Sequence, residues 1–399
     1  MTTEVTDLAG LRVAIVHYWL VSRGGGEKVV EALAEMFPQA DLFSLIAIQE
    51  ALSPALQKHT LRTSFIQKIP GGRKFHRYFL PLQPLALEQF DLSGYDLVIS
   101  SESGPAKGVI TSSKTCHICY CHSPMRYIWD MYPDYKLAFS PMVRPAFSLV
   151  AHYLRLWDRA SADRVDYFVA NSKFVASRIR KFYRRDSAVI YPPVAVSTGN
   201  VLRVAEDYYI AIGRLVDYKR FDLSIEACTK LNKRLLVIGD GPSRKALQRA
   251  AGPTVTFLGE VSDGELRNHL ASSRALLFPG EEDFGIVPVE AQSFGKPVIA
   301  YASGGALETV RAAFSEEGEI ENPTGVFFQN HSVSGLTDAI LRFEAMEKEG
   351  KFRPHTIRQH AKQFDKSIFQ LRMAHFLRSA LKDFRAGGEH RAAGISAAS

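Results

Sequence analysis

The chain has 399 residues, 46% of them hydrophobic and 23% charged, which is the composition of a folded protein with substantial cores. This length predicts two or three domains, and no run of about 18 apolar residues is present, so no membrane-spanning helix is expected. The formal net charge of +7 favours anionic partners such as nucleotide phosphates, nucleic acid or an acidic membrane surface. The first residues, MTTEVTDLAGLRVAIV, lack the basic leader of a secretory signal and predict a cytoplasmic protein.

Short apolar strands alternate with amphipathic helices in the first half of the chain. Strands are predicted at residues 11–17, 96–101, 117–122 and 167–171, and in the stretch AVIYPP. A glycine-rich loop, SRGGGE, follows the first strand and opens a helix, KVVEALAEMF. Another helix is expected in SKFVASRIRKFY, where Ser172 is placed to cap the first turn.

Three of the four cysteines lie close together in TCHICYCHSP. Because His117 and His122 stand beside them, a metal site is one interpretation. Alternation along a strand, however, places Cys119 and Cys121 on one face and Cys116 on the other, and no second ligand pair follows at zinc spacing. Buried strand cysteines are therefore the preferred interpretation.

The same alternation starts again after Pro192 and Pro193. Strands are predicted at residues 208–213, 234–239, 254–259, 274–279, 296–301 and 325–329, and helices follow the first five. Alternating elements of this kind form parallel sheets that are covered by helices on both faces. The predicted fold is therefore α/β, with two doubly wound, Rossmann-like domains facing each other across a cleft.

The predicted domains are residues 1–198 and residues 199–365. A long helix at 366–386 is expected to return to the first domain, and residues 387–399 are expected to form a disordered tail. Because open parallel sheets bind ligands beyond the carboxyl ends of their strands, the loops at those ends carry the candidate functional residues.

An acidic loop, GEEDFG, lies between a predicted strand and a helix expected at residues 287–294. A carboxylate such as Glu282 can accept hydrogen bonds from several hydroxyls, and Glu290 could hold another part of an extended ligand. Free backbone N–H groups near the start of the helix suit phosphate or sugar oxygens; they belong to Asp283, Phe284 and Gly285. An acidic first turn that only complements the helix dipole is the alternative.

A basic loop, AIGRLVDYKRFD, follows the strand that ends at Gly213. Arg214 and Lys219 are two cations at the carboxyl end of a strand, which suits a diphosphate. Two solvated surface cations are the alternative for this loop alone. That alternative loses weight because the acidic loop is expected to converge on the same cleft.

Two glycine-rich turns and one histidine complete the candidates. Gly239 and Gly241 in VIGDGPSRKAL predict a tight structural turn, whereas Gly25 and Gly26 in RGGGEKVVEAL let backbone approach a phosphate. Neither G-x-G-x-x-G nor the acidic residue of a dinucleotide site is present, which disfavours hydride transfer. His122 ends a predicted strand and is expected to point into the cleft, although a lone histidine is often structural.

The stretches GRLVDYK, VIGDGP, FLGEVSDGEL and FPGEEDFGIVPVEAQSFGKPVIAYASGGALETV resemble the retaining glycosyltransferases of family 4, which have the GT-B fold. The pairing of Glu282 with Glu290 is the signature of that family. In the first domain, VAIVHYWLVSRGGGEKVVEALAEMFPQADLFSL and ICYCHSPMRYIWD are similar to the WbaZ-type mannosyltransferases of bacterial O-antigen and exopolysaccharide assembly. Those enzymes typically use GDP-mannose and extend a polyprenyl-diphosphate-linked sugar.

The resemblance implies a role for each candidate. The implied catalytic residues are Glu282, His122, Arg214 and Lys219. The implied donor-binding residues are Gly25, Gly26, Gly213, Gly259, Val261, Asp283, Phe284, Gly285 and Glu290. Arg214 and Lys219 would hold the donor diphosphate, and Glu282 would hold the hydroxyls of the donor sugar. Glu290 would bind the ribose, and His122 would lie beside the transferred sugar.

The remaining implied roles concern the phosphates, the base and the metal. Gly25 and Gly26 would approach the phosphates, and the segment 259–261 would lie near the base. Arg220 departs from the usual family pattern, in which glycine often follows the lysine, and this puts the local turn in doubt. The sequence contains no Asp-x-Asp metal motif. Cationic side chains and helix N-termini can stabilise a leaving diphosphate, so transfer without a metal or cofactor is predicted. The family implies retention of configuration, by front-face attack.

Residues 57–90 mix basic and apolar side chains in a way that suits an anionic membrane surface. The residues concerned are Lys58, Arg62, Lys68, Arg73, Lys74, Arg77, Phe65, Ile66, Phe75, Tyr78 and Phe79. A solvated helix face with buried aromatic rings is the alternative. Because the resemblance implies a lipid-linked acceptor, peripheral contact with the inner face of the cytoplasmic membrane is predicted.

Three other functions compete with this prediction. The same fold could use a UDP-sugar donor, or act as a sugar-nucleotide epimerase that needs no acceptor. A basic nucleic-acid-binding protein is the non-enzymatic alternative. It is disfavoured because the charges are scattered over both domains and no recognised binding module is present.

Overall fold

The computed structural model describes residues 8–22, 24–196, 205–315 and 318–396. The chain forms two compact units, one of Met1–Pro193 with Ser367–Ser399 and the other of Val194–Lys366. The domain boundary expected between residues 198 and 199 lies outside the described residues. Within the described ranges, no helix is both long and apolar enough to cross a membrane.

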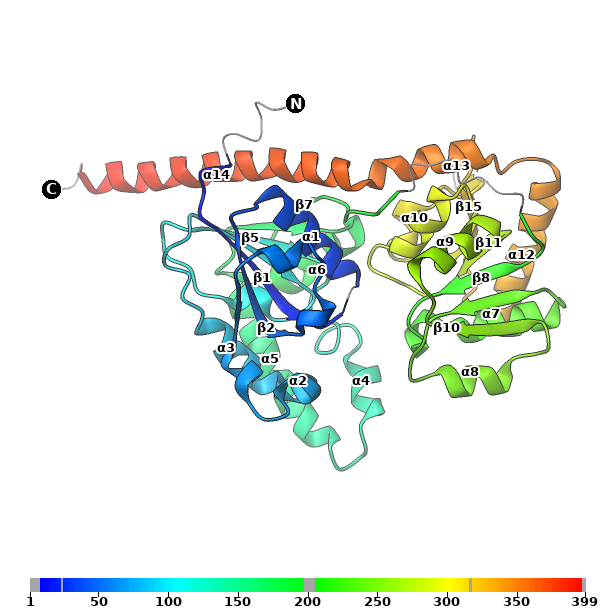
Figure 1. Cartoon of the computed structure of the whole chain (residues 1–399), viewed down its shortest axis with the longest axis horizontal. Helices are drawn as coiled ribbons and strands as arrows, with labels where there is room; N and C mark the ends of the chain where they lie inside the picture. The colour runs from blue at the N-terminus through cyan, green and yellow to red at the C-terminus, as the bar shows by residue number, and fades with distance from the viewer. Residues whose placement is uncertain (1–7, 23, 197–204, 316–317, 397–399) are drawn as a thin grey trace. The chain divides into compact units, whose positions relative to one another are not determined.

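The first unit contains a parallel sheet of seven strands in the order β3-β2-β1-β4-β5-β6-β7 (Figure 1). The strands are β1 (Val13–Leu20), β2 (Asp41–Ala47), β3 (Leu61–Thr63), β4 (Leu97–Glu102), β5 (Cys116–Cys121), β6 (Tyr167–Ala170) and β7 (Ser187–Val189). The strand order reverses between β1 and β4, as in a doubly wound sheet. β2 and β3 extend this sheet beyond the strands that the sequence analysis predicted.

Helices cover both faces of this sheet. They are α1 (Gly25–Met36), α2 (Gly72–Phe75), α3 (Gln83–Glu88), α4 (Tyr132–Ala138), α5 (Arg144–Ala162), α6 (Lys173–Tyr183) and α14 (Lys366–Ser396). Short 3₁₀ turns are η1 (Gln49–Ala51), η2 (Leu56–Lys58), η3 (Phe65–Lys68), η4 (His76–Leu82) and η5 (Ala106–Gly108). The predicted cap of α6 is confirmed, because the Ser172 hydroxyl accepts a hydrogen bond of 3.0 Å from the Val175 N–H.

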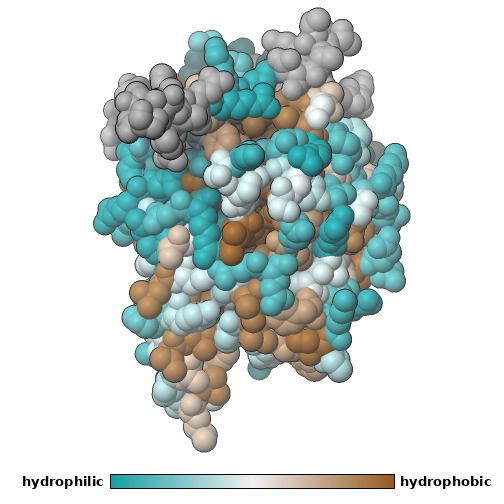
Figure 2. Space-filling view, turned by 90° about the vertical axis from the view of Figure 1, so that its left-hand side faces the viewer, coloured by the Kyte–Doolittle hydropathy of each residue, from teal (hydrophilic) through white to brown (hydrophobic). Residues whose placement is uncertain are grey.

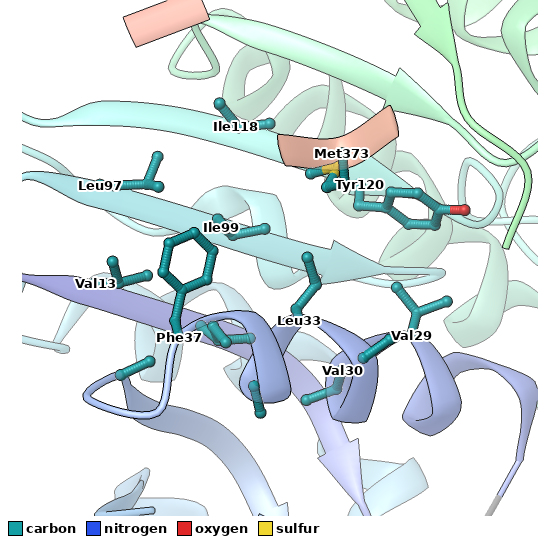
Figure 3. Close-up of a cluster of buried hydrophobic side chains, with 14 of the residues drawn as sticks. Val13, Val29, Val30, Leu33, Phe37, Leu97, Ile99, Ile118, Tyr120 and Met373 are labelled. Atoms are coloured by element: carbon teal, nitrogen blue, oxygen red, sulfur yellow. The ribbon is translucent and has the colours of Figure 1, made fainter. Parts of the chain in front are cut away.

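The core of the first unit joins α1 and α14 to one face of the sheet. Figure 3 shows Leu33 of α1 near Ile99 of the sheet, with Met373 of α14 beside Tyr120 of β5. All four side chains are buried. The helix at the end of the sequence is therefore an integral part of the first unit.

The structure differs from the disordered tail expected at residues 387–399, because α14 continues to Ser396. The segment AGGEHRAAGIS contains alanine, glutamate and arginine, which are good helix formers, and extending an existing helix needs no new nucleation. The three glycines weaken the helix by roughly 1 kcal/mol each but do not end it. Residues 397–399 lie outside the described residues.

The second unit contains a parallel sheet in the order β10-β9-β8-β11-β12-β15. Its strands are β8 (Tyr209–Ile212), β9 (Leu235–Ile238), β10 (Val255–Gly259), β11 (Ala275–Phe278), β12 (Val298–Tyr301) and β15 (Gly325–Phe328), with a separate hairpin of β13 (Phe314–Ser315) and β14 (Gly318–Glu319). Numbered from β8, this is the Rossmann order 3-2-1-4-5-6, with the switch point between β8 and β11. The prediction of two doubly wound sheets is confirmed.

Helices also flank the second sheet. They are α7 (Phe221–Lys230), α8 (Arg244–Ala250), α9 (Asp263–Ser272), α10 (Ile286–Ser293), α11 (Ala306–Thr309), α12 (Val333–Lys348) and α13 (Pro354–Ala361). Two 3₁₀ turns, η6 (Asp217–Lys219) and η7 (Lys362–Phe364), complete the unit. The hairpin of β13 and β14 was not anticipated from the sequence.

The cysteines are buried strand and helix residues, and all four are free thiols. Cys116 packs in the core that contains α1, whereas Cys119 and Cys121 pack in the cluster that contains α6. The predicted placement on opposite faces of β5 is therefore confirmed. No group of three or more His, Cys, Asp or Glu side chains in the described ranges is arranged to hold a metal ion.

Candidate active site

The basic and acidic loops meet at the switch point of the second sheet. β8 ends at Ile212 and β11, its neighbour, ends at Phe278. Lys219 follows β8 and Glu282 follows β11, and the Lys219 Nζ lies 2.8 Å from the Glu282 Oε1. The side chains are only 15% and 21% exposed. Two of the predicted catalytic residues therefore form a largely buried ion pair where such sheets bind their ligands.

Two glycines leave the space that Lys219 occupies. A Cβ added at Gly213 would lie 2.9 Å from the Lys219 Nζ, and one at Gly280 would lie 2.7 Å from the Lys219 Cα. Gly213 also has a φ of +143°, which side chains rarely adopt. The predicted donor-binding residue Gly213 thus contacts the ammonium group directly, and any larger residue would displace it.

A third loop, which follows β12, fixes the backbone of Glu282. The Gly305 N–H donates a hydrogen bond of 2.8 Å to the Glu282 carbonyl, and the Ser303 hydroxyl donates to the Glu281 carboxylate. Gly304 has a φ of +61°, and a Cβ there would lie 2.4 Å from the Glu282 carbonyl oxygen. None of the residues of this third loop was predicted from the sequence as part of the site. Their signal was the SGG that follows a predicted strand.

The predicted amide donors lie at the start of α10. Gly285 is the N-cap, with a φ of +86° and no side-chain cap, and the helix begins at Ile286, one residue earlier than predicted. Phe284 is buried, and Asp283 is partly buried. Glu290 lies on α10 and is partly buried. A helix start capped only by glycine suits an anionic or hydroxyl oxygen.

Gly259 and Val261 lie farther along the same edge of the sheet. The Gly239 N–H donates to the Gly259 carbonyl over 2.7 Å, and the Gly213 N–H donates to the Ile238 carbonyl over 3.0 Å. A Cβ at Gly239 would lie 2.1 Å from the Gly213 carbonyl oxygen, so Gly239 is structural, as predicted. The carboxyl ends of β8, β9 and β10 are therefore linked in one row.

Arg214 is not held in the site by the residues that the structure describes. Its side chain is exposed and forms no hydrogen bond or ion pair with them. Of the two cations predicted to hold a diphosphate, Lys219 is the one held by an ion pair among the described residues.

Arg220 adopts the backbone conformation that glycine favours, with a φ of +53°. Its guanidinium donates to both carboxylate oxygens of Asp222 over 3.1 Å. This departure from the usual family pattern therefore leaves the turn intact, at the cost of a left-handed non-glycine residue.

A second group of candidates lies in the first unit, where Ser101 holds two imidazoles. The His17 Nδ1 donates to the Ser101 carbonyl over 2.9 Å, and the His122 Nε2 lies 2.8 Å from the Ser101 hydroxyl. A Cβ at Gly26 would lie 3.4 Å from the His17 Cε1 and 3.6 Å from the His122 Nε2. The predicted residues His122 and Gly26 are therefore neighbours. His17 and Ser101 were missed, although both end strands predicted from the sequence.

Both imidazoles are neutral near pH 7. Burial, with a smaller contribution from His122, lowers the pKa of His17 to about 3. Burial lowers the pKa of His122 to about 4, although part of that residue remains exposed. At neutral pH, each ring therefore offers one N–H donor and one acceptor nitrogen.

The glycine loop beside these imidazoles is closed by Glu27. The Ser22 hydroxyl donates to the Glu27 carboxylate over 2.9 Å, and the Gly24 N–H donates to it over 3.1 Å. Gly24 is the N-cap of α1, and Gly25 is its first residue. The loop is thus held against the start of α1, with Gly25 and Gly26 in the first turn.

A buried charged cluster lies behind Ser101. Glu102, the last residue of β4, accepts a hydrogen bond of 2.9 Å from the Lys107 N–H, and the Lys107 ammonium is paired with Asp158. Burial raises the pKa of Glu102 to about 7. Trp129 also donates to Asp158, over 2.7 Å. These contacts fix the end of β4, from which Ser101 reaches the two histidines.

Two family models together match most of the chain. The model described as Glycosyltransferase Family 4 matches residues 23–198, and the one described as Glycosyl transferases group 1 matches residues 199–363. The chain belongs to the family 4 glycosyltransferases. The family 4 resemblance in the sequence is thereby confirmed.

Three curated proteins are among the relatives to which this family 4 glycosyltransferase is similar in sequence. Alpha-1,3/1,6-mannosyltransferase ALG2 of Candida glabrata is 26% identical over 384 residues, which cover 79% of this chain and 81% of the relative. D-inositol 3-phosphate glycosyltransferase of Mycobacterium marinum is 27% identical, over 56% of this chain and 52% of the relative. A GDP-mannose-dependent alpha-(1-6)-phosphatidylinositol monomannoside mannosyltransferase of Mycobacterium tuberculosis is 32% identical, over 33% and 36%. The chain thus spans about half or less of the last two relatives.

Solved structures share the fold of this glycosyltransferase. Anabaena HepE in complex with UDP and glucose has a TM-score of 0.65 at 17% identity, covering 92% of this chain and 100% of that chain. Sucrose-phosphate synthase of Thermosynechococcus elongatus has a TM-score of 0.65 at 16% identity, covering 93% and 100%. At such low sequence identity, these similarities establish only the fold, which is GT-B.

Proposed function

We propose that this glycosyltransferase transfers mannose from GDP-mannose, with retention, onto a lipid-linked saccharide in the synthesis of a bacterial surface polysaccharide such as O-antigen or exopolysaccharide. The observation that carries the proposal is the ion pair of Lys219 and Glu282 at the switch point of a family 4 sheet. The choice of mannose is supported by two relatives that are named mannosyltransferases, one of them GDP-mannose-dependent.

The ion pair gives each loop a separate task. An ammonium group suits the donor diphosphate, and a carboxylate can accept hydrogen bonds from two sugar hydroxyls. When the diphosphate binds Lys219, the ion pair between Lys219 and Glu282 weakens. The Glu282 carboxylate then accepts hydrogen bonds from the sugar hydroxyls. Glu282 therefore positions the sugar and is not a covalent nucleophile. The start of α10 adds N–H donors, and Glu290 on the same helix binds the ribose.

Charge that develops on the leaving diphosphate is stabilised by this chain's own groups. Lys219 and Arg214 supply cations, and a helix N-terminus supplies oriented dipoles, which together replace a metal ion. The departing diphosphate accepts the proton of the attacking hydroxyl on the same face, so configuration is retained. The proposal therefore includes no metal and no cofactor.

The experiment that tests the donor is a panel of nucleotide sugars. A ligand at 100 times its dissociation constant stabilises the native state by about 2.7 kcal/mol. GDP-mannose is expected to raise the unfolding temperature, whereas UDP-glucose and UDP-galactose are expected to leave it unchanged. Protection by a UDP-sugar alone would replace the mannose proposal with the alternative donor. Product analysis with donor alone separates transfer from epimerisation.

The lipid-linked acceptor places this chain at an anionic membrane surface, and α5 provides the apolar side of the contact. Leu149, Tyr153 and Leu156 recur every three or four residues along one side of α5, with leucine exposures of 72% and 62%. Met142, just before the helix, is 92% exposed. Figure 2 shows apolar atoms gathered at the lower end of this view, where Figure 1 places α2 and α5.

The basic segment at residues 57–90 adjoins α5. Leu80 of η4 packs against Phe147 and Leu154 on the buried side of α5, so the two segments are neighbours. Of the predicted apolar residues, Phe75 and Tyr78 are exposed, whereas Ile66 is buried. Exposed cations accompany them: Lys58, Arg62, Lys68 and Arg73. The side chains of Lys74 and Arg77 lie outside the described residues. Exposed apolar side chains beside cations favour an anionic bilayer surface.

A further inference from the structure

The His17 imidazole carries a buried acceptor atom without a partner. His17 lies on β1 and is 1% exposed. Because a carbonyl oxygen only accepts hydrogen bonds, the contact with Ser101 places the proton on Nδ1 and the lone pair on Nε2. No described residue donates a hydrogen bond to this Nε2. A buried acceptor without a donor is costly to leave unsatisfied, so the position favours a donor from outside the chain.

The first turn of α1 lies directly beside this atom. A Cβ at Gly26 would lie 3.8 Å from the His17 Nε2 and 3.6 Å from the His122 Nε2, so both rings converge on Gly26. α1 has 12 residues, and its N-cap Gly24 provides no side-chain cap. The first-turn N–H groups have no carbonyl partner within the helix, and of these the Glu27 N–H donates to the carboxylate of Glu27 itself. Acceptor and donor groups of the chain therefore lie side by side.

These two kinds of group together match a hydroxyl. A hydroxyl can donate its proton to the His17 Nε2 while its oxygen accepts from an N–H at the start of α1. A phosphate oxygen without a proton satisfies the N–H but gives nothing to a neutral imidazole. A cation has no acceptor for the N–H. Sugar hydroxyls are therefore the favoured ligand among the chemical groups of a glycosyl transfer.

We propose that His17 is a substrate-binding residue whose Nε2 accepts a hydrogen bond from a sugar hydroxyl at the start of α1. This inference rests on the proposed function, since it assumes that a sugar binds in the first unit. The hydroxyl belongs either to the donor sugar or to the acceptor saccharide. Both sources present the same chemistry, and the experiment below separates them.

Nitrogen NMR of the full chain, labelled with ¹⁵N at histidine, tests the proposal. The unprotonated His17 Nε2, assigned by its loss in His17→Gln, is expected to move to lower frequency when it accepts a hydroxyl. Movement with GDP-mannose alone assigns the hydroxyl to the donor. Movement only after methyl α-D-mannoside is added assigns it to the acceptor. An unchanged resonance with both probes overturns the proposal, because a bound water at Nε2 would not respond to sugar.

Failure of this inference is distinct from failure of the proposed function. If GDP-mannose does not raise the unfolding temperature, the donor assignment fails, and the NMR experiment is repeated with UDP-glucose. If GDP-mannose raises it while the His17 Nε2 resonance stays unchanged with both probes, only the role of His17 fails.

Two substitutions separate the contacts of the two ring nitrogens. His17→Asn can keep an N–H to the Ser101 carbonyl but lacks the Nε2 acceptor, whereas His17→Gln can place an amide oxygen near the Nε2 position. With methyl α-D-mannoside present, release of GDP from GDP-mannose is expected to fall at least tenfold in His17→Asn and less in His17→Gln. Equal rates in both variants and the parent chain would overturn the proposal.

His117 provides the matched control. It is also a fully buried histidine of the same sheet, its Nε2 lies 2.9 Å from the Ser100 hydroxyl, and its Nδ1 has no described partner. It lies near the start of β5, away from the carboxyl end that carries His122. His117→Asn is expected to lower stability but to keep the rate of GDP release per folded molecule. A fall as large as that of His17→Asn would contradict the proposal.

Discussion

The Lys219 ammonium group and the Glu282 carboxylate lie 2.8 Å apart, although they stand on loops that follow different strands. A largely buried ion pair adds little net stability, because the desolvation of both charges offsets their attraction. It does fix the position of each loop relative to the other. The pair therefore holds the groups proposed for diphosphate and sugar in place before the donor binds.

Removing either member of this pair tests the site directly. We expect Lys219→Ala and Glu282→Ala each to lower the rate of transfer at least a hundredfold, on the order of 3 kcal/mol in transition-state stabilisation. Steady-state kinetics with GDP-mannose measure the effect. The matched control is Lys233→Ala, which breaks another lysine–glutamate pair of 2.8 Å, with Glu344 on α12. Near-normal turnover in both site variants would refute the assignment.

Backbone strain at Arg220 gives a stability prediction. Arg220→Gly and Arg220→Ala both delete the contact with Asp222, but only alanine keeps a Cβ at a φ of +53°. The glycine variant is therefore expected to be more stable than the alanine variant by about 1 kcal/mol. Urea unfolding of the two variants measures the difference. If alanine proved the more stable, the left-handed conformation at this position would be wrong.

The buried histidines predict how stability depends on pH. Burial lowers the pKa of His117 from 6.5 to about 4, so below pH 6.5 the unfolded chain binds a proton that the native chain does not. Stability is therefore lost as the pH falls from 6.5 towards 4. Between pH 5 and 6, His117→Asn should reduce the slope of the unfolding free energy by about 1.2 kcal/mol per pH unit.

The comparison of slopes isolates His117 from other titrating groups. Glu102, whose pKa burial raises to about 7, acts in the opposite direction, because its native form keeps a proton that the unfolded form has lost. Glu102 and His17 are present in both proteins, so their contributions cancel in the difference. Equal slopes for parent and variant would mean that His117 titrates normally in the native state.

The exposed side of α5 gives a prediction for membrane binding. Leu149→Ser and Leu156→Ser are each expected to weaken binding to phosphatidylglycerol-containing vesicles about tenfold, which corresponds to about 1.4 kcal/mol. Flotation at low salt measures the bound fraction. The control is Leu341→Ser, since Leu341 is an exposed leucine of α12 in the second unit. If the parent chain does not float with the vesicles, the membrane proposal is wrong. If the α5 variants show the same bound fraction as the parent chain, the membrane contact lies on a surface other than α5.

Metal removal tests the proposed chemistry of the leaving diphosphate. If Lys219, Arg214 and the start of α10 stabilise it, dialysis against EDTA should leave the rate of transfer unchanged, and added Mg²⁺ should not raise it. GDP release from GDP-mannose provides the measurement. A large loss that Mg²⁺ restores would show that the reaction needs a divalent ion.

Much of the fold could be predicted because its signals are local. Continuous apolar runs such as residues 11–17 and 117–122 became β1 and β5, and alternation placed Cys116 opposite Cys119 and Cys121. β3 has only three residues and carries too little pattern to be recognised. β2, DLFSLIA, is mostly apolar without alternation, a pattern that periodicity alone does not distinguish from a buried helix.

The candidate site was predictable where charge marked it and unpredictable where packing did. Lys219 and Glu282 stood out as charges at the ends of strands, and the structure joins them. His17 reads from the sequence as one residue of an apolar strand. Its role depends on the register that sets it opposite Ser101, a residue 84 positions away. Such a contact arises from sheet pairing, which a local pattern does not contain.

The second unit is an insertion within the first, because α14 supplies Phe369, Met373 and Leu377 to the core that β1 and α1 begin. During synthesis on the ribosome, residues 194–366 are complete before those three side chains exist. The second unit can therefore reach its native state as an independent intermediate, while the earlier half of the chain waits with an open apolar surface that chaperones can bind.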